Sequence, residues 1–578
     1  MQLKSILAIG VIQLCSLTVL AQTQPQNTYN ENVVVQGHYR PELEQQQKLY
    51  FPVRINDTAA KASHHYTYTI QPTRLKALYE PTRIKAARVI GEPATRLYNN
   101  YFRVGFGNYF SPLFDAYFSS TRDKKKTYGA SINHLSSWGT LPDYGKNHFG
   151  QTNVTLFGKY IIKEKLQLHS DLSYLHDHNL YYGFTDSTLL ATLVKQRDDI
   201  STTDYTASYN TATWNIGLQN MQLDERKLGY AANVKLSDLW AGYGQNEFNL
   251  TLTADVRYGF NIKNKYDGVA YLHTEWDGFL QRFNAPDAAS MPLGFSPTAI
   301  TDTTRSSKNI VKINPYADFT SNGLQFHVGF TAAWDGFSQQ TVFRFFPDVV
   351  VTKKIFNDLI AIDLGATGSI ESNSIASVSA INPYLSPGAQ FEATRHYDFL
   401  SHLRWNISRK LEARAEVGYS LVQNDLTFAT DTNYLLGNVF SPTFFDNNRF
   451  NVGASVDFVN DEILHLQAGG HWYHYALADD NALLCYRPTW DAHLTAQANY
   501  HDRWLLTLEG RLLSKMTDDH GDDMPMRYGI NAEVEYRHNK AISFFVKMNN
   551  LAFQRYYLWR NYPSQRGLFL VGLTYTLN

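Results

Sequence analysis

From residue 100 to its end, the sequence alternates apolar and polar residues with a period of two. Residues 248–258, 411–421 and 528–536 show this most clearly, each with one apolar series and one polar series that includes full charges. A period of two is the side-chain period of a β-strand, whereas a helix repeats about every 3.6 residues. We therefore predict an all-β fold for residues 100–578, built from strands with one apolar and one polar face.

Two all-β architectures share this pattern, and the lengths of the connections distinguish them. A soluble sandwich turns the polar faces of its strands to water, whereas a membrane barrel turns the apolar faces to lipid. In this chain short turns and longer loops alternate, as expected when one rim faces the periplasm and the other the cell exterior. Short turns are expected near residues 122–126, 162–165, 221–227, 261–265, 321–323, 354–358, 407–410, 459–462, 500–503 and 538–540. Long loops are expected near residues 181–202, 281–308, 371–392, 424–448, 476–486, 515–525 and 550–566.

The sequence thus predicts a transmembrane antiparallel β-barrel of about 22 strands (20–22), with short periplasmic turns and long extracellular loops. The composition agrees, because the chain combines 38 Tyr, 34 Phe and 10 Trp with a mean hydropathy of only −0.35. Half of each strand would face a wet lumen, and the aromatic residues would form girdles at the two membrane interfaces. Aromatic residues expected in the girdles are Trp472, Tyr473, Trp504, Tyr536 and residues 556–559.

Charge and cysteine content exclude several other classes. A formal net charge of −1 argues against nucleic acid as a partner, which would require clustered excess Lys and Arg. The two cysteines, Cys15 and Cys485, supply neither a disulfide framework nor a Cys-based metal site. We expect Cys485 to be a structural thiol rather than a nucleophile. Beyond the N-terminus no apolar run reaches the ~18 residues of a membrane-spanning helix.

The N-terminus has the features of a secretory signal peptide. A basic start at Lys4 precedes an apolar run over residues 6–20, and a small residue, Ala21, follows. Leu14 stands where a lipoprotein signal would need a small residue before Cys15, which argues against lipidation. We expect export to the Gram-negative outer membrane and three segments: a signal peptide (1–21), a periplasmic or lumenal N-terminal segment (22–99) and the barrel (100–578).

The C-terminal residues resemble the strand that ends outer-membrane barrels. Gly572, Tyr575 and Leu577 follow the spacing of the signal read by the barrel-insertion machinery, although Leu577 replaces the usual aromatic residue and Asn578 follows it. The residues before this strand resemble the last hairpin of TonB-dependent receptors, with Asn-Leu at 550–551 and Tyr-Pro at 562–563. The resemblance covers the barrel by pattern, and it is specific over about the last 35 residues.

A second resemblance lies near the expected mature N-terminus. Val33, Val34 and Val35 resemble the TonB-box-like segment of such receptors from Bacteroidota. That resemblance implies a TonB-type energy coupler as partner, bound by adding a strand to a sheet edge. The family places a larger globular plug after the box, whereas only residues 38–99 are available here. A lumen as wide as that of a 22-stranded barrel is kept plugged in relatives, so we expect this segment, inward-folded loops or a partner protein to fill it.

Other candidate sites are weaker. Residues 517–523 gather four Asp and one His, for which a solvated outer loop is preferred to a Ca²⁺ site because the EF-hand spacing is missing. His471 and His474 fall on opposite faces of one strand, and neither they nor His64 and His65 are expected to bind a metal. Neither G-x-S-x-G nor H-E-x-x-H occurs, so we expect no enzyme activity and no cofactor.

Three functions remain open for such a barrel. The first is uptake across the outer membrane by a TonB-dependent receptor-like protein. The second is a scaffold that anchors other outer-membrane or surface proteins, and the loops expected at 281–308 and 424–448 are large enough for either role. The third, a passive porin, is disfavoured because the sequence marks no constriction loop. In each case outer-membrane lipids surround the barrel.

Overall fold

The structure is a computed structural model that describes residues 100–577 except 121–122, 143, 185–205, 222–226, 263–265, 285–303, 338–340, 357, 461–462 and 479–482. The predicted signal peptide, the segment 22–99 with Val33, Val34 and Val35, and His64 and His65 lie outside the described residues.

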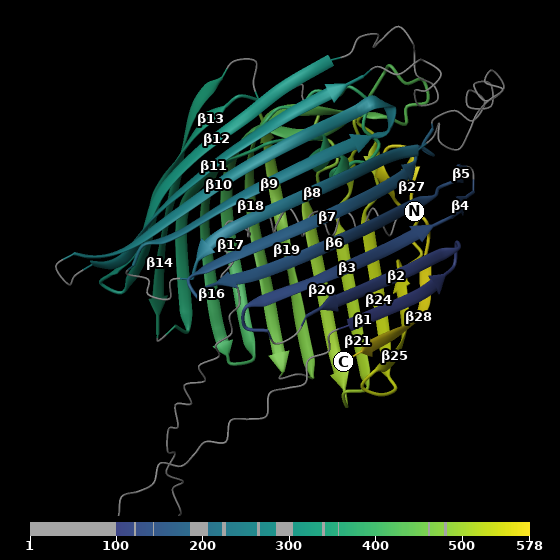
Figure 1. The fold of residues 1–578 in the computed structure, drawn as a ribbon. Helices are drawn as coiled ribbons and strands as arrows, with labels where there is room; N and C mark the ends of the chain where they lie inside the picture. Colours follow the sequence, from purple (N-terminus) through teal and green to yellow (C-terminus); the bar gives the residue numbers. More distant parts are fainter. Residues whose placement is uncertain are drawn as a thin grey trace, which may run out of the picture. The chain divides into compact units, whose positions relative to one another are not determined.

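Twenty-two long strands form one closed antiparallel sheet (Figure 1). Each strand pairs with its neighbour along the chain, and the first and last strands pair with each other in the register Gly105↔Gly572. This pairing closes the barrel, so its sheet has no free edge. The prediction of an all-β antiparallel barrel of about 22 strands is confirmed.

The first half of the barrel consists of β1 (Asn100–Gly107), β2 (Ser111–Ser119), β3 (Lys126–Ser137), β6 (Phe149–Ile162), β7 (Leu166–Leu180), β8 (Thr206–Asn220), β9 (Gly229–Ala241), β10 (Gln245–Ile262), β11 (Tyr266–Phe283), β12 (Thr304–Ser321) and β13 (Leu324–Asp335). The second half consists of β14 (Val342–Ile355), β15 (Ile360–Glu371), β16 (Thr394–Ser408), β17 (Leu411–Thr430), β18 (Phe440–Asn460), β19 (Leu464–Leu477), β20 (Trp490–Tyr500), β21 (Trp504–Leu513), β24 (Arg527–Arg537), β25 (Ile542–Asn549) and β28 (Leu568–Leu577). Short elements in the connections are β4 (Thr140–Leu141), β5 (Gly145–Lys146), β22 (Met516–Thr517), β23 (Asp523–Met524), β26 (Tyr557–Trp559), β27 (Tyr562–Pro563), the 3₁₀ turn η2 (Gly242–Gly244) and the helix α3 (Ile375–Ile381).

The two rims of the barrel differ in their connections. The predicted short turns all lie at one rim, here called the turn rim, and the opposite loop rim carries the long connections (Figure 1). Three connections at the loop rim are also short, at residues 108–110, at η2 and at residues 336–341.

The extents of two predicted loops were wrong. Within residues 424–448, β17 continues to Thr430 and β18 begins at Phe440, so only residues 431–439 connect them. Asn424, expected to begin the loop, instead sits at a β-bulge with a φ of 54°. Asn tolerates this left-handed conformation, and the ladder resumes beyond it. The predicted loop at 281–308 is likewise shortened to residues 284–303.

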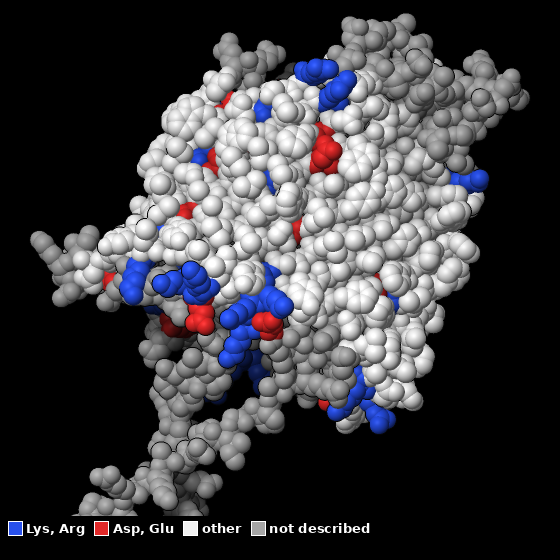
Figure 2. Space-filling model, in the orientation of Figure 1, with Lys and Arg blue, Asp and Glu red and all other residues white. Residues whose placement is uncertain are grey.

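The outer face of the barrel is apolar, and the inner face is polar. On β10, Leu252 and Val256 are about 40% exposed on the outside, while Asp255 and Arg257 belong to the inner series. The visible outer face is mostly uncharged, and Lys and Arg gather at the turn rim (Figure 2). Among the described residues, no helix is long and apolar enough to cross a bilayer.

The aromatic girdle prediction is confirmed at some positions and wrong at others. Trp472 and Trp504 are more than 40% exposed on the outer face. Tyr473 belongs instead to the inner series of β19, next to Trp472. Tyr556 and Trp559 are buried inside the barrel mouth, because the loop that carries them turns inward.

Candidate functional site

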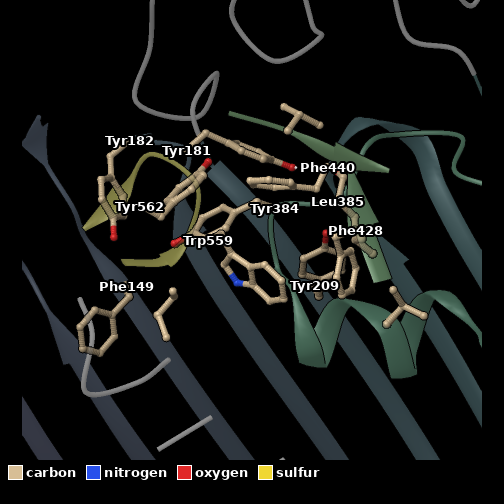
Figure 3. Close-up of a cluster of buried hydrophobic side chains, with 14 of the residues drawn as sticks. Phe149, Tyr181, Tyr182, Tyr209, Tyr384, Leu385, Phe428, Phe440, Trp559 and Tyr562 are labelled. Atoms are coloured by element: carbon tan, nitrogen blue, oxygen red, sulfur yellow. Dashed lines mark hydrogen bonds between the residues drawn. The ribbon is translucent and has the colours of Figure 1, made fainter. Parts of the chain in front are cut away.

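The long connections fold inward and form a hydrophobic core inside the barrel mouth (Figure 3). We call this core, with the connections that build it, the cap. Its connections include residues 372–393, 431–439, 483–489, 514–526 and 550–567. Large side chains buried in it are Phe149, Tyr181, Tyr182, Tyr209, Tyr384, Leu385, Phe428, Phe440, Trp559 and Tyr562. Of the fillers considered from the sequence, inward-folded loops are therefore present.

Three tyrosines mark the centre of the cap. Tyr182 follows β7, Tyr384 lies between β15 and β16, and Tyr562 lies between β25 and β28, so they come from well-separated parts of the ring. Tyr384 and Tyr562 stack with centroids 3.7 Å apart, and Tyr182 meets Tyr562 edge-on at 5.0 Å. Each is at most 4% exposed. Loops from three sides of the barrel thus meet across its mouth.

The tyrosine hydroxyls tie the loops to one another. Burial raises the pKa of Tyr182, Tyr384 and Tyr562 well above the ordinary value, which keeps these hydroxyls protonated. The hydroxyls of Tyr181, Tyr182 and Tyr562 each donate a hydrogen bond to a backbone carbonyl oxygen of another loop. Without that bond the carbonyl oxygen would be a buried acceptor with no partner. These bonds run from Tyr181 to Leu385 (3.2 Å), from Tyr182 to Pro563 (2.9 Å) and from Tyr562 to Asn438 (2.6 Å).

Close approach of the loops depends on Gly183. A Cβ atom at this position would lie 2.7 Å from Cε2 of Tyr562 and 2.9 Å from the carbonyl oxygen of Asn561. Tyr562 has no room to retreat, since it is fully buried and stacked on Tyr384. The absence of a side chain at residue 183 therefore lets the connection after β7 reach the centre of the cap.

The wall at β10 and β12 anchors helix α3. The carboxylate of Glu247 accepts hydrogen bonds from the backbone N–H groups of Ile375 (2.7 Å) and Ala376 (3.3 Å) at the start of the helix. Ser374 closes the same end with a capping box. The ammonium of Lys308 donates to the carbonyl oxygen of Phe391. The connection between β15 and β16 is thus fixed to the wall formed by β10 and β12.

Two carboxylates of the connection between β21 and β24 bind side chains from other connections of the cap. Asp518 accepts from Arg560 (3.0 Å), and Asp519 accepts from the Tyr486 hydroxyl (2.9 Å). Burial alone would raise the pKa of Asp519, but its hydrogen bonds from Thr430 and Tyr486 hold that pKa below its usual value. The prediction of a solvated loop at residues 517–523 was wrong for these two side chains, because they are buried as inter-loop clamps.

Asp518, Asp519 and His520 offer ligand atoms within 4.8 Å of one another. The backbone N–H groups of His520 and Asp522 occupy one Asp518 oxygen, at 2.9 Å each, and Arg560 occupies the other. These hydrogen bonds account for the position of the Asp518 carboxylate without a bound metal ion.

Cys485 lies in the same part of the cap. Its side chain is 5% exposed, and burial together with the nearby Asp519 and Asp518 raises the pKa of the thiol to about 11. A thiol with this pKa is protonated at neutral pH and therefore a poor nucleophile. The expectation of a structural thiol agrees with this environment.

Below the cap, a belt of histidines and carboxylates follows the lumenal wall. His273 bonds Asp255 at 2.6 Å, and His327 lies between Asp318 (2.7 Å) and Asp348 (3.1 Å). Further along, His471 lies 3.5 Å from Glu416 and 3.4 Å from Asp491. The belt gives the lumen a polar, mainly acidic lining over β10–β20. His474 stacks on the outward-facing Trp472, so the predicted separation of His471 from His474 is confirmed.

The predicted barrel-assembly residues lie on the strand that closes the barrel. Tyr575 and Leu577 are each 38% exposed on the outer face of β28. Gly572 belongs to the inner series, where a Cβ atom would lie 2.2 Å from the carbonyl oxygen of Val104 and 2.4 Å from the ring of Phe545. Their recognition by the insertion machinery stays a prediction.

Inward-folded loops were one of the fillers expected from the sequence, but sequence reasoning did not identify the residues that form the cap. Its residues are hundreds of positions apart, but one signal was present: the connection at 550–567 is rich in aromatic residues where a solvated loop would be polar.

Comparisons with known proteins identify the fold. No protein-family model and no curated protein matches the sequence. Among solved structures, the ferric-catecholate import receptor of E. coli K12 matches with a TM-score of 0.60 at 10% identity, over 84% of this chain and 82% of that one. The siderophore receptor of Acinetobacter baumannii matches at 0.61 and 10%, over 84% and 81%. The iron transporter of Neisseria meningitidis matches at 0.60 and 10%, over 84% and 82%. The chain therefore has the β-barrel fold of TonB-dependent outer-membrane receptors.

Proposed function

We propose that this protein is a TonB-dependent receptor-like barrel of the Gram-negative outer membrane that takes up a solute from the cell exterior. The observation that carries the proposal is the combination of a receptor-type barrel with a cap across its mouth. A passive porin needs an open path, whereas a barrel that imports selectively needs a mouth that opens for its ligand.

The lumen supports the same function. Below the cap, hydrogen-bonded His and carboxylate side chains line the wall, including the pairs of His273 with Asp255 and His327 with Asp318. Such a lining suits passage of a polar solute. The solved structures with this fold include import receptors and an iron transporter, and the exposed parts of the loop rim would meet the solute first.

The proposal extends to the N-terminal residues. The signal peptide, residues 1–21, would direct export, and Val33, Val34 and Val35 would bind a TonB-type coupler as an added strand. In this proposal the receptor is of the Bacteroidota type and lacks a standard plug.

A second candidate function is a scaffold for other outer-membrane or surface proteins. The specific observation in its favour is the packing of the cap, which buries large aromatic side chains as the core of a soluble domain does. A permanently shut barrel would need no gating and would present its loops to partners.

Growth and copurification separate the two functions. A strain that lacks the protein is compared with one complemented by the wild type, by Val34→Pro or by Val34→Ala, on a panel of single nutrient sources. Proline removes the backbone N–H that strand addition uses, and alanine keeps it. Uptake predicts a growth defect on a particular nutrient that wild type and Val34→Ala repair and Val34→Pro does not. Normal growth on every source, with a stoichiometric copurifying partner, would favour the scaffold.

A further inference from the structure

Three connections at the turn rim form one continuous row. They join β2 to β3, β6 to β7 and β8 to β9, and they are neighbours because β3 pairs with β6 and β7 pairs with β8. Backbone hydrogen bonds also link them. The N–H of Ile161 donates to the carbonyl oxygen of Lys125 at 2.6 Å, and the N–H of Met221 donates to that of Lys165 at 2.7 Å. Side chains on these connections therefore belong to one surface.

This surface is rich in positive charge. We call residues 120–126, 163–165 and 221–228 the basic rim, because they carry eight Lys and Arg against four Asp and Glu. The lysines that the structure describes here are all exposed, and Lys and Arg gather at the turn rim in Figure 2. These lysines are Lys124, Lys125, Lys126, Lys163, Lys165 and Lys227.

The charge has the opposite sign at the other ends of the same strands. The connections between β3 and β6, β7 and β8, and β9 and β10 cover residues 138–148, 181–205 and 242–244. Together they carry three Lys and Arg against five Asp and Glu. The excess of positive charge is thus specific to the turn rim of this wall.

Turn formation does not explain the lysines. Lys163 and Glu164 occupy the two central positions of their turn, with φ of 49° and 57°. Asn and Gly adopt this left-handed conformation at the least cost. The turn between β12 and β13 uses that pair, Asn322 and Gly323, with φ of 51° and 72°. A lysine at residue 163 is therefore not the residue that the turn geometry favours.

A row of outward tyrosines marks the depth of the basic rim in the membrane. Tyr128, Tyr160 and Tyr230 are 60%, 49% and 44% exposed on the outer face of their strands. Tyrosines at the end of an apolar band lie at the membrane interface, among the lipid headgroups. Lys126 pairs in register with Tyr160, so it belongs to the same lipid-facing series. The basic rim therefore begins at the level of the headgroups.

From this arrangement we propose that the basic rim binds anionic phospholipid of the periplasmic leaflet, with its lysines contacting headgroup phosphates. Clusters of four to eight basic residues beside a membrane bind anionic lipid in this way. A lysine ammonium is a point charge on a flexible stem, which suits a mobile headgroup. The continuity with the lipid-facing tyrosines favours a lipid over an acidic protein. The proposal does not depend on whether the barrel performs uptake.

Fluorescence quenching beside the basic rim tests this preference. The full-length protein carries one fluorophore at Tyr160→Cys, with Cys15→Ser and Cys485→Ala, in phosphatidylcholine vesicles. Nitroxide-labelled phosphatidylglycerol or nitroxide-labelled phosphatidylcholine is the quencher. We expect an affinity for the phosphatidylglycerol about fivefold higher or more, since one lysine near an anionic headgroup contributes about that factor. The preference should fall in about 1 M salt, where the Debye length is about 3 Å.

Charge variants assign the preference to the basic rim. Lys124→Gln/Lys125→Gln/Lys126→Gln and Lys163→Gln/Lys165→Gln should each lower it, and the combined variant should bring the two affinities within about twofold. Lys235→Gln/Lys515→Gln is the control and should keep the wild-type preference. Lys235 pairs with Thr251 of the inner series of β10, and Lys515 lies in the connection between β21 and β24 at the loop rim.

Two results would overturn the proposal. One is equal affinity of the wild type for the two labelled lipids, which would leave the positive charge to a partner of another class. The other is an unchanged preference in the combined variant. Quenching by labelled phosphatidylcholine reports that each variant is inserted in the bilayer, and if the combined variant fails to insert, the two partial variants decide.

Discussion

Replacement of Gly183 by alanine should open the cap while leaving the barrel intact. The new methyl group would lie 2.7 Å from the Tyr562 ring, which is fully buried and held by its stack on Tyr384 and its bond to Asn438. Overpacking of a buried site costs about 1–3 kcal/mol. Because about 1.4 kcal/mol is a factor of ten, the open population should rise about 5- to 150-fold.

Cys485 reports the opening. Its thiol is 5% exposed in the closed cap, and Tyr486 beside it packs on Trp559, 4.9 Å between ring centroids. Trp559 in turn contacts Phe440, which contacts Tyr562, with centroids about 6 Å apart in each step. If the cap opens as a unit, displacement of Tyr562 should expose the thiol to a maleimide in proportion to the open population.

The assay compares labelling rates of the wild type, Gly183→Ala and Gly529→Ala, all with Cys15→Ser. Gly529 lies in β24, and a Cβ atom there has no heavy atom within 4 Å, so its substitution controls for the added methyl group. We expect faster labelling only in Gly183→Ala. Equal rates in all three proteins would refute the view that the loops form one cooperative cap that depends on contact at Gly183.

Three other substitutions test the barrel and its clamps. On β10, Leu252→Arg should lower the free energy of folding into lipid vesicles by about 2–4 kcal/mol, because residue 252 faces lipid. Thr253→Arg should lower it much less, because residue 253 faces the lumen. Equal losses of stability in the two variants would contradict the assignment of faces. Asp335→Asn should lower the free energy of unfolding by about 3–5 kcal/mol in chemical denaturation, because it leaves the buried charge of Arg395 without its carboxylate. The double variant Asp335→Asn/Arg395→Met should recover part of this loss. No recovery would show that loss of the ion pair is not the cause. Asp519→Asn should lower thermal stability at pH 7 by about 1–2 kcal/mol, since the depressed pKa of Asp519 stabilises the fold above an unfolded value near 4. That difference should shrink as the pH falls below the unfolded value and through the depressed pKa, and a difference that does not change with pH in this range would contradict the mechanism.

The strands were predictable because each has two environments. Lipid on one side and a polar lumen on the other impose alternation, as on β10, where Leu252 and Val256 alternate with Asp255 and Arg257. The strand prediction failed where the two faces of a strand no longer have different environments. Beyond Asn424 cap residues contact both series of β17, because Thr427 donates to the carbonyl oxygen of Cys485 and Phe428 packs on Trp559, so both side chains are buried and the alternation no longer marks a strand.

The cap was not predictable from sequence patterns for a different reason. Contacts among Tyr182, Tyr384 and Tyr562 depend on the ring that brings their loops together, and no local pattern encodes the ring.

The central claim, a cap that closes the mouth and must open for uptake, is tested most directly by a reversible cross-link. Leu385, in the connection between β15 and β16, forms a parallel bridge with Phe440, the first residue of β18, and residues paired in this way lie about 5 Å apart, within disulfide range. Uptake is measured for Leu385→Cys/Phe440→Cys in a Cys485→Ala background, oxidised and then reduced. The control, Met516→Cys/Met524→Cys, joins paired residues within one connection. We predict that oxidation stops uptake only in the first variant and that reduction restores it. Undiminished uptake through the oxidised, cross-linked cap would contradict the account.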